Sequence, residues 1–212
     1  MKIKNISEIL FLPTLLAIGI IAGISGYIPK CLTDGNLPTY LLGLLVFQVG
    51  LGLGSRNDFS EILHTVRIKT LLFPLFTIAG TLIANIFTLP FLQEIGIKDC
   101  LAIGSGFGYY SLSSMLILQF KSPVVGVEVA TLLASISLMA NMIREIIALV
   151  FCPIISKKGY GVSAISLAGI NSMDICLPSI LSDRSRNDLM PLAIIHGIIL
   201  EISVPVLLTL FC

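Results

Sequence analysis

The chain has 212 residues, of which 56% are hydrophobic and only 12% are charged, and its formal net charge is +1. Ordinary soluble domains carry about 25% charged residues, so this composition excludes a soluble globular enzyme. Thirteen basic and twelve acidic side chains leave no basic surface for nucleic acid. One crossing of a bilayer needs roughly 20 apolar residues, so this length allows about five to seven crossings.

The fold predicted from this pattern is an all-α integral membrane protein with one transmembrane domain over residues 1–212. Seven hydrophobic segments are predicted, at about residues 9–29, 38–54, 70–90, 98–120, 123–155, 161–181 and 189–211. Lys2 and Lys4 precede the first segment, which has no small-residue cleavage site, so we interpret it as a retained span and not as a signal peptide. The five cysteines are far apart, and we expect no metal and no cofactor.

Two of the seven segments are broken by turn-forming residues. The fourth contains Gly-Ser-Gly-Phe-Gly-Tyr-Tyr-Ser-Leu-Ser at 104–113, and the sixth contains Gly-Ile-Asn-Ser-Met-Asp-Ile-Cys-Leu-Pro at 169–178. Unwound backbone in hydrocarbon costs several kcal/mol per unpaired group unless it is buried in protein or lines a watery cavity. Glycines that merely ease helix packing are the alternative. Paired broken helices are otherwise the best sequence indication of a transporter's substrate site.

The distribution of basic residues bears on two topologies. If both broken segments cross the membrane, seven spans leave eight bases on one side and four on the other. If both are re-entrant hairpins, five full spans leave nine and three, and the hairpins enter from opposite faces as an inverted repeat requires. The positive-inside rule favours the hairpins. Both topologies predict a cytoplasmic amino terminus and an external carboxyl terminus.

Seven polar or ionisable side chains lie within or at the start of the apolar segments, where such groups are rarely kept without a partner or a purpose. They are Glu8, Asn141, Arg144, Glu145, Asp174, His196 and Glu201. Asp174 lies in the second break, where free N–H groups and water could keep it ionised. A structural acid that only accepts hydrogen bonds is the alternative.

Asn141, Arg144 and Glu145 are spaced to share one face of the longest predicted helix. Arg144 could form a structural ion pair with Glu145 or with Asp174. The sequence does not choose between that pair and a role in function.

The remaining polar groups allow other interpretations. His196 is either a proton relay or a neutral, hydrogen-bonded side chain. Glu8 suits a helix amino terminus, and the role of Glu201 is open. An intramembrane hydrolase with Ser105 as nucleophile and His196 as base is an alternative, although the sequence around Ser105 is not a nucleophile elbow.

Four motifs occur in a fixed order. They are Gly-Ser-Gly-Phe-Gly-Tyr-Tyr-Ser-Leu-Ser from Gly104, Arg-Glu-Ile-Ile-Ala from Arg144, Asn-Ser-Met-Asp-Ile-Cys-Leu-Pro from Asn171, and Ile-His-Gly from Ile195. Together they resemble the LysO lysine exporter family. The resemblance covers nearly the whole chain and about the carboxyl-terminal two thirds of longer members. A small membrane partner supplying about three more spans, or a homo-oligomer, is therefore expected.

The resemblance implies export of L-lysine across the cytoplasmic (inner) membrane, and no enzyme activity. It matches Asp174 to the family's intramembrane aspartate and Glu8 to its intramembrane glutamate. The expected lining is Ser105, Tyr109, Tyr110, Ser111, Asn171 and Ser172, supported by Asn141, Arg144, Glu145, His196 and Glu201. Two departures, Ala140-Asn141 for an Asn-Asp pair and Glu201 for a small polar residue, widen the expected substrate to L-lysine or a similar cationic amino acid.

Proton antiport is the expected mechanism, with sodium as the alternative coupling ion. Asp174 could hold a proton or the substrate's ammonium group but not both, and this competition would couple the two flows. The amino termini exposed by the breaks could bind the substrate's carboxylate. A non-transporting subunit of a membrane complex and a channel are the rival functions.

Overall fold

The computed structural model describes residues 68–91, 95–181 and 189–212, together with 18–25 and the single residues 14, 40, 44, 47 and 51. These fall into two units, Met1–Gly43 and Leu44–Cys212. In the first unit residues 18–25 are helical, as the predicted first span requires. Most of that span, most of the segment 38–54, and Glu8 lie outside the described residues. The single domain over 1–212 stays a prediction.

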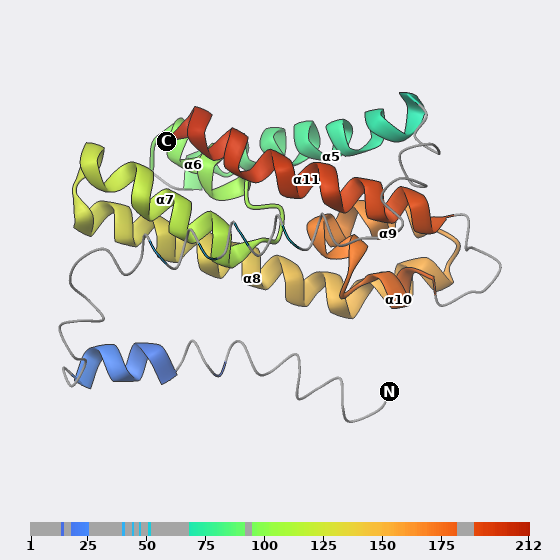
Figure 1. Ribbon diagram of the computed structural model, residues 1–212, viewed down its shortest axis with the longest axis horizontal. Helices are drawn as coiled ribbons and strands as arrows, with labels where there is room; N and C mark the ends of the chain where they lie inside the picture. The colour runs from blue at the N-terminus through green and yellow to red at the C-terminus, as the bar shows by residue number, and fades with distance from the viewer. Residues whose placement is uncertain are drawn as a thin grey trace. The chain divides into compact units, whose positions relative to one another are not determined.

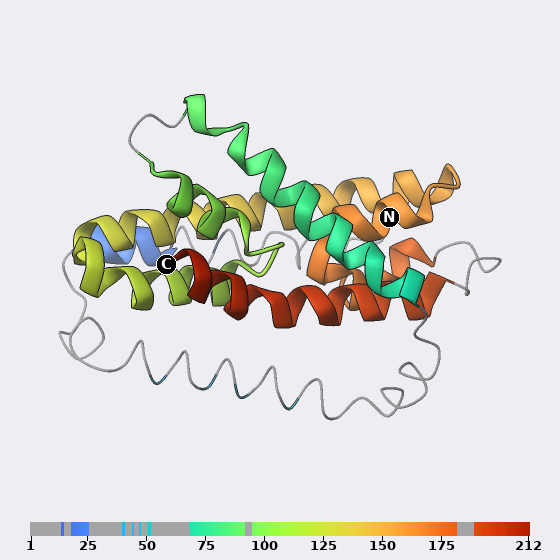
Figure 2. The same ribbon diagram turned by 90° about the horizontal axis from the view of Figure 1, so that it is seen from above.

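The described part of the second unit is built from helices. In chain order they are α5 (Ile68–Ile86), η1 (Leu89–Phe91), α6 (Ile97–Gly104), α7 (Tyr110–Val125), α8 (Val127–Lys157), α9 (Gly161–Ala168), η2 (Gly169–Met173), α10 (Leu177–Ile180) and α11 (Leu189–Phe211). Two of them, α8 and α11, are long and apolar enough to cross a membrane, with mean hydropathies of 1.9 and 2.1. The predicted all-α membrane fold is confirmed, and α5 crosses the other long helices at an angle (Figure 2).

The first broken segment is a hairpin that enters and leaves at the same end of α8. Asp99 in the first turn of α6 forms an ion pair with Lys121 near the end of α7, with 2.7 Å between Oδ1 and Nζ. Gly126 then turns the chain into α8 with a φ of +85°, which an L side chain rarely adopts. We call residues 97–125 hairpin 1. Figure 1 shows α7 beside the first half of α8.

The second broken segment is a hairpin at the opposite end of α8. The Cys152 thiol of α8 donates to the Ala164 carbonyl of α9 at 3.3 Å. The Ser156 hydroxyl, one turn further along α8, donates to the Ile180 carbonyl at 2.6 Å. The chain therefore both enters and leaves beside the last turns of α8. We call residues 161–181 hairpin 2, and Figure 1 shows α9 and α10 together at this end.

These contacts decide between the two topologies that the sequence left open. Seven crossings would put the start of α6 and the end of α7 on opposite sides of the membrane, whereas the Asp99–Lys121 ion pair joins them. The described part of the chain thus has three long helices, α5, α8 and α11, and two hairpins that point toward each other. The predicted start of the long helix at residue 123 is wrong by four residues, because α7 continues through Pro123 and ends only at the Gly126 turn.

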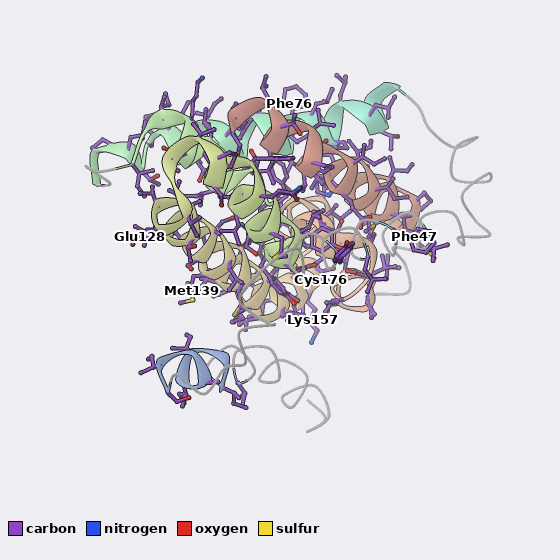
Figure 3. The ribbon with its side chains drawn as sticks, turned by 60° about the vertical axis from the view of Figure 1, so that its left-hand side comes forward. Phe47, Phe76, Glu128, Met139, Lys157 and Cys176 are labelled. Atoms are coloured by element: carbon purple, nitrogen blue, oxygen red, sulfur yellow. The ribbon has the colours of Figure 1, made fainter. Side chains whose placement is uncertain are left out.

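Most side chains in the core between α8, hairpin 2 and α11 are small, and Ile165, Ile180 and Leu189 are the large ones. The core contains Ala148, Ala164, Ala168 and Ala193 together with the buried free thiol of Cys152. Small residues let helix backbones approach closely. The van der Waals contacts made in this way hold helices together in a membrane, where the hydrophobic effect does not drive their association. The outer faces carry large apolar side chains, and Phe76 and Met139 point outward on different sides in Figure 3. Lipid is the solvent that such a surface suits.

We expect cysteines placed at Lys98 and at Glu128 to be labelled from the same side of the membrane, and a cysteine at Lys158 from the other. All three positions are exposed, and Figure 3 marks the ends of α8 near Glu128 and Lys157. The measurement is labelling of intact cells by an impermeant thiol reagent, in a background without the native cysteines. Labelling of Lys98 and Glu128 from opposite sides would contradict hairpin 1. With the orientation predicted from the basic residues, Lys158 is cytoplasmic.

Candidate functional site

The tips of the two hairpins touch each other. The backbone N–H of Ile170 in hairpin 2 donates to the carbonyl of Phe107 in hairpin 1 at 3.2 Å. Gly169 makes this approach possible, because a Cβ there would overlap the Phe107 carbonyl oxygen. The Gly169 backbone, at φ 62° and ψ −128°, lies in a region that essentially only glycine adopts. Both predicted breaks thus meet at one point.

Asn141 of α8 holds the tip of hairpin 1. Its side-chain oxygen accepts the N–H of Gly108 at 2.9 Å, and its amide nitrogen donates to the carbonyl of Ile103 at 3.2 Å and to that of Ser137 at 2.9 Å. A hydrogen bond to an unwound backbone group removes the cost of leaving that group unpaired in hydrocarbon. Asn141, predicted from its position within an apolar segment, therefore supports the break.

His196 of α11 holds the tip of hairpin 2. Its Nδ1 lies 3.3 Å from the Ser172 hydroxyl, which donates to the Ala193 carbonyl at 2.9 Å. Its Nε2 lies 3.1 Å from the Thr77 hydroxyl of α5, which is itself 3.1 Å from the Ser166 hydroxyl of α9. The imidazole is fully buried. Of the two roles that the sequence allowed, this geometry fits the hydrogen-bonded side chain.

The two hairpins are supported in parallel ways. Hairpin 1 is followed by α8, whose Asn141 binds its tip, and hairpin 2 is followed by α11, whose His196 binds its tip. The hairpins enter from opposite ends of α8. This is the arrangement of an inverted repeat, which the sequence suggested.

Three carboxylates gather around the start of α7. Asp174 follows η2 at the tip of hairpin 2 and is exposed, whereas Glu145 of α8 and Glu201 of α11 are buried, with 6% and 8% of their surface accessible. Asp174 and Glu201 act electrostatically on Tyr109. Glu145 interacts electrostatically with Tyr110, and Asp174 interacts electrostatically with Glu145. These acids from hairpin 2, α8 and α11 are groups that could bind an ammonium group.

Arg144 lies apart from these acids. Among the described residues no carboxylate forms an ion pair with it, so the expected pair with Glu145 or Asp174 is not formed. Its guanidinium carbon lies 5.9 Å from the centre of the Phe107 ring. The half-buried Arg144 lines an open pocket of about 530 Å³, and the other lining residues are Phe73, Val162, Ser163, Ser166 and Leu167.

The other predicted site residues are placed differently from one another. Asn171 is buried at the tip of hairpin 2, and its amide nitrogen has no hydrogen-bond partner within the described residues. Ser111 is half-buried in the first turn of α7. Ser105 follows the last residue of α6 and is fully buried, and its hydroxyl donates to the Leu101 carbonyl of α6 at 2.7 Å.

The hydrolase alternative finds no support in the described residues. No hydrogen bond joins Ser105 to His196, whose two ring nitrogens face Ser172 and Thr77. Thr77 and Ser166 were not predicted as part of the site. A single hydroxyl in an apolar segment carries no sequence signal that would have distinguished them.

Two opposed hairpins with touching tips and acids beside them, in an all-α membrane protein, are typical of secondary transporters. The chain belongs to the family described as "Lysine exporter LysO", whose family model matches residues 14–212. It is 32% identical over 212 residues to "Lysine exporter LysO" of Escherichia coli (strain K12), covering 99% of this chain and 66% of that protein. It is 30% identical over 174 residues to "Putative lysine exporter" of Haemophilus influenzae, covering 81% and 82%. No solved structure matches.

We expect Gly169→Ala to destabilise the contact between the hairpin tips. An alanine at this φ and ψ costs about 1–3 kcal/mol of backbone strain, and its methyl group would overlap the Phe107 carbonyl oxygen. The thermal unfolding midpoint of the purified protein should fall by several degrees. Gly80→Ala in α5 is the control, because a Cβ there meets nothing within 4 Å. Equal midpoints for the two variants would show that the tip contact adds no stability.

Proposed function

We propose that the chain exports L-lysine or a similar cationic amino acid across the cytoplasmic membrane in exchange for a proton. One observation carries the proposal: carboxylates of hairpin 2, α8 and α11 lie close enough to the start of α7, which follows the tip of hairpin 1, to act electrostatically on Tyr109 and Tyr110. Membership of the lysine exporter family supports the substrate class. The chain spans 66% of the E. coli relative, slightly under two thirds, so the activity of that protein comes to this chain as part of the proposal.

The carboxyl groups of Asp174, Glu145 and Glu201 are the groups that would bind the positively charged side chain of the substrate. Burial of an ammonium group is unfavourable unless the group has a partner of opposite charge and hydrogen-bond acceptors. A carboxylate supplies the opposite charge and the acceptors. Asp174 is the acid that an incoming ammonium group meets first, because it is exposed while Glu145 and Glu201 are buried. The Tyr109 and Tyr110 side chains lie close to these acids.

Exchange for a proton removes an electrical obstacle to export. A cytoplasm-negative potential opposes the exit of a monovalent cation by about 2.3 kcal/mol per 100 mV. One proton entering for each lysine leaving cancels that charge. Asp174 can bind the proton or the ammonium group but not both, so loading on one side requires release of the other. Sodium could replace the proton in the same scheme.

The two hairpins suit an alternating-access mechanism. Hairpin 1 enters from one end of α8 and hairpin 2 from the other, and a backbone hydrogen bond joins their tips. Withdrawal of hairpin 2 would open the acids to one side of the membrane, and withdrawal of hairpin 1 would open them to the other. With the predicted orientation, hairpin 2 faces the cytoplasm. The long helices would form the scaffold against which each hairpin moves.

We expect Asp174→Asn to reduce driven lysine export to about a tenth of the wild-type rate or less, because it removes a charge-assisted bond worth about 1.5–3 kcal/mol and also the proton site. The measurement is lysine efflux from cells that lack other lysine exporters, normalised to the amount of inserted protein. Glu128→Gln is the matched control, since Glu128 is an exposed acid in the first turn of α8, away from the tips.

Export by Asp174→Asn near the wild-type rate would contradict the role of this acid, and Glu145, Glu201 or Glu8 would then carry the coupling. Absence of lysine efflux in the wild type would contradict the function itself. Lysine counterflow in vesicles separates a carrier from a channel, because a channel does not accelerate uptake when unlabelled lysine is trapped inside.

A further inference from the structure

Arg144 is a cation near the middle of α8, and no anion among the described residues forms an ion pair with it. Ionisable groups inside a membrane are usually paired with each other or with backbone carbonyls. Within the described residues Arg144 forms no ion pair and no hydrogen bond. Its guanidinium lies near the face of the Phe107 ring and beside Gly169 at the tip of hairpin 2. Glu145, the next residue on α8, acts on Tyr110 at the start of α7 and does not pair with Arg144. The guanidinium is left available to an anion that is not part of these elements.

The pocket in front of Arg144 has the chemistry of a site for a small carboxylate with an apolar chain. Two hydroxyls, of Ser163 and Ser166, line it together with the guanidinium. Its remaining lining is Phe73, Val162 and Leu167, which suits methylene groups. A guanidinium binds a carboxylate through two parallel hydrogen bonds, so it selects for this group by geometry as well as by charge.

Position along the helix excludes a lipid head group as the anion. Arg144 is 17 residues from the start of α8 and 13 from its end, which is about 26 Å and 20 Å along the axis. Lipid phosphates lie outside a hydrocarbon core of about 30 Å, so they do not reach its middle. An anion at this depth has to enter through the protein.

We propose that Arg144, with the pocket formed by α5, α8 and α9, binds the α-carboxylate of the exported amino acid. This inference rests on the proposed function and divides the substrate between two regions of opposite charge. The carboxylate lies at Arg144, and the side-chain ammonium group lies at the acids around Tyr109 and Tyr110. The uncapped amino terminus of α7 and the unpaired Asn171 amide are the rival donors for the carboxylate. They carry no full charge, whereas Arg144 does.

Three ligands and two variants separate these assignments. L-Lysine carries both groups, norleucine lacks the side-chain ammonium group, and 1,5-diaminopentane lacks the carboxylate. Affinity is measured as the ligand-dependent rise in the unfolding midpoint of the purified full chain in detergent. Arg144→Gln should weaken lysine binding by about tenfold or more and abolish stabilisation by norleucine, because the charged fork is lost. Binding of 1,5-diaminopentane should be little changed. Asp174→Asn should show the reverse pattern, with diaminopentane lost and norleucine kept.

Two further variants keep the test decisive if Arg144→Gln does not fold. Arg144→Lys retains the charge without the fork and should restore part of the lysine affinity. Ser163→Leu fills the pocket from an exposed position on α9 and should weaken lysine and norleucine while sparing diaminopentane. Chloride at equal ionic strength is the control anion. Stabilisation by chloride that equals stabilisation by norleucine would overturn the proposal, because the site would then accept any small anion.

The inference and the proposed function fail in different ways. Equal weakening of lysine and diaminopentane by Arg144→Gln would mean that Arg144 serves the fold, and unchanged lysine binding would assign the carboxylate to the rival donors. Either result overturns the inference and leaves lysine export standing. The opposite result is a protein that norleucine stabilises only when Arg144 is present, but that transports no lysine. It would support carboxylate binding at Arg144 and overturn the export function.

Discussion

The contact between the two hairpin tips is the constraint on which the rest of the structure depends. Each break leaves backbone N–H and carbonyl groups at a depth where no lipid can bind them. The hydrogen bond from Ile170 to Phe107 satisfies two of these groups, and Asn141 satisfies others. The tips therefore need each other and need polar side chains on the helices beside them. An apolar residue in place of Asn141 would leave the Gly108 N–H and the Ile103 carbonyl without those bonds.

The two hairpins solve this problem with different chemistry. Asn141 binds backbone groups directly and lies entirely within the contact between α8 and hairpin 1. His196 binds side-chain hydroxyls, and through Thr77 its connections reach α5 and α9 as well. Hairpin 2 is thus tied to the scaffold by a chain of hydrogen bonds through His196. Hairpin 1 is held at its tip by the Asn141 amide, and along its arms by the Ser137–Ser113 hydrogen bond to α8 and the bond from the Cys100 thiol to the Asn85 carbonyl of α5. This difference gives each hairpin its own set of bonds to break when it moves.

Charges of opposite sign on α8 face different neighbours. Arg144 faces a pocket with hydroxyls and apolar walls, while Glu145, one residue later on the same helix, faces the start of α7. Adjacent helical residues point about 100° apart, so α8 presents a cation and an acid to different neighbours. In our proposal the substrate binds Arg144 through its carboxylate and the acids near the start of α7 through its side-chain ammonium group.

Much of this protein follows from its sequence alone. The apolar segments, the two breaks and the polar groups Asp174 and Asn141 could be predicted because local composition determines whether a helix can cross a membrane and where it must unwind. Hydropathy is the same for a crossing segment and a re-entrant one, so only the Asp99–Lys121 contact showed that hairpin 1 returns. The sequence likewise offered Glu145 and Asp174 as partners of Arg144, and the structure leaves it unpaired within the described residues. Which groups meet across elements depends on packing, and a pattern along one chain does not contain that information.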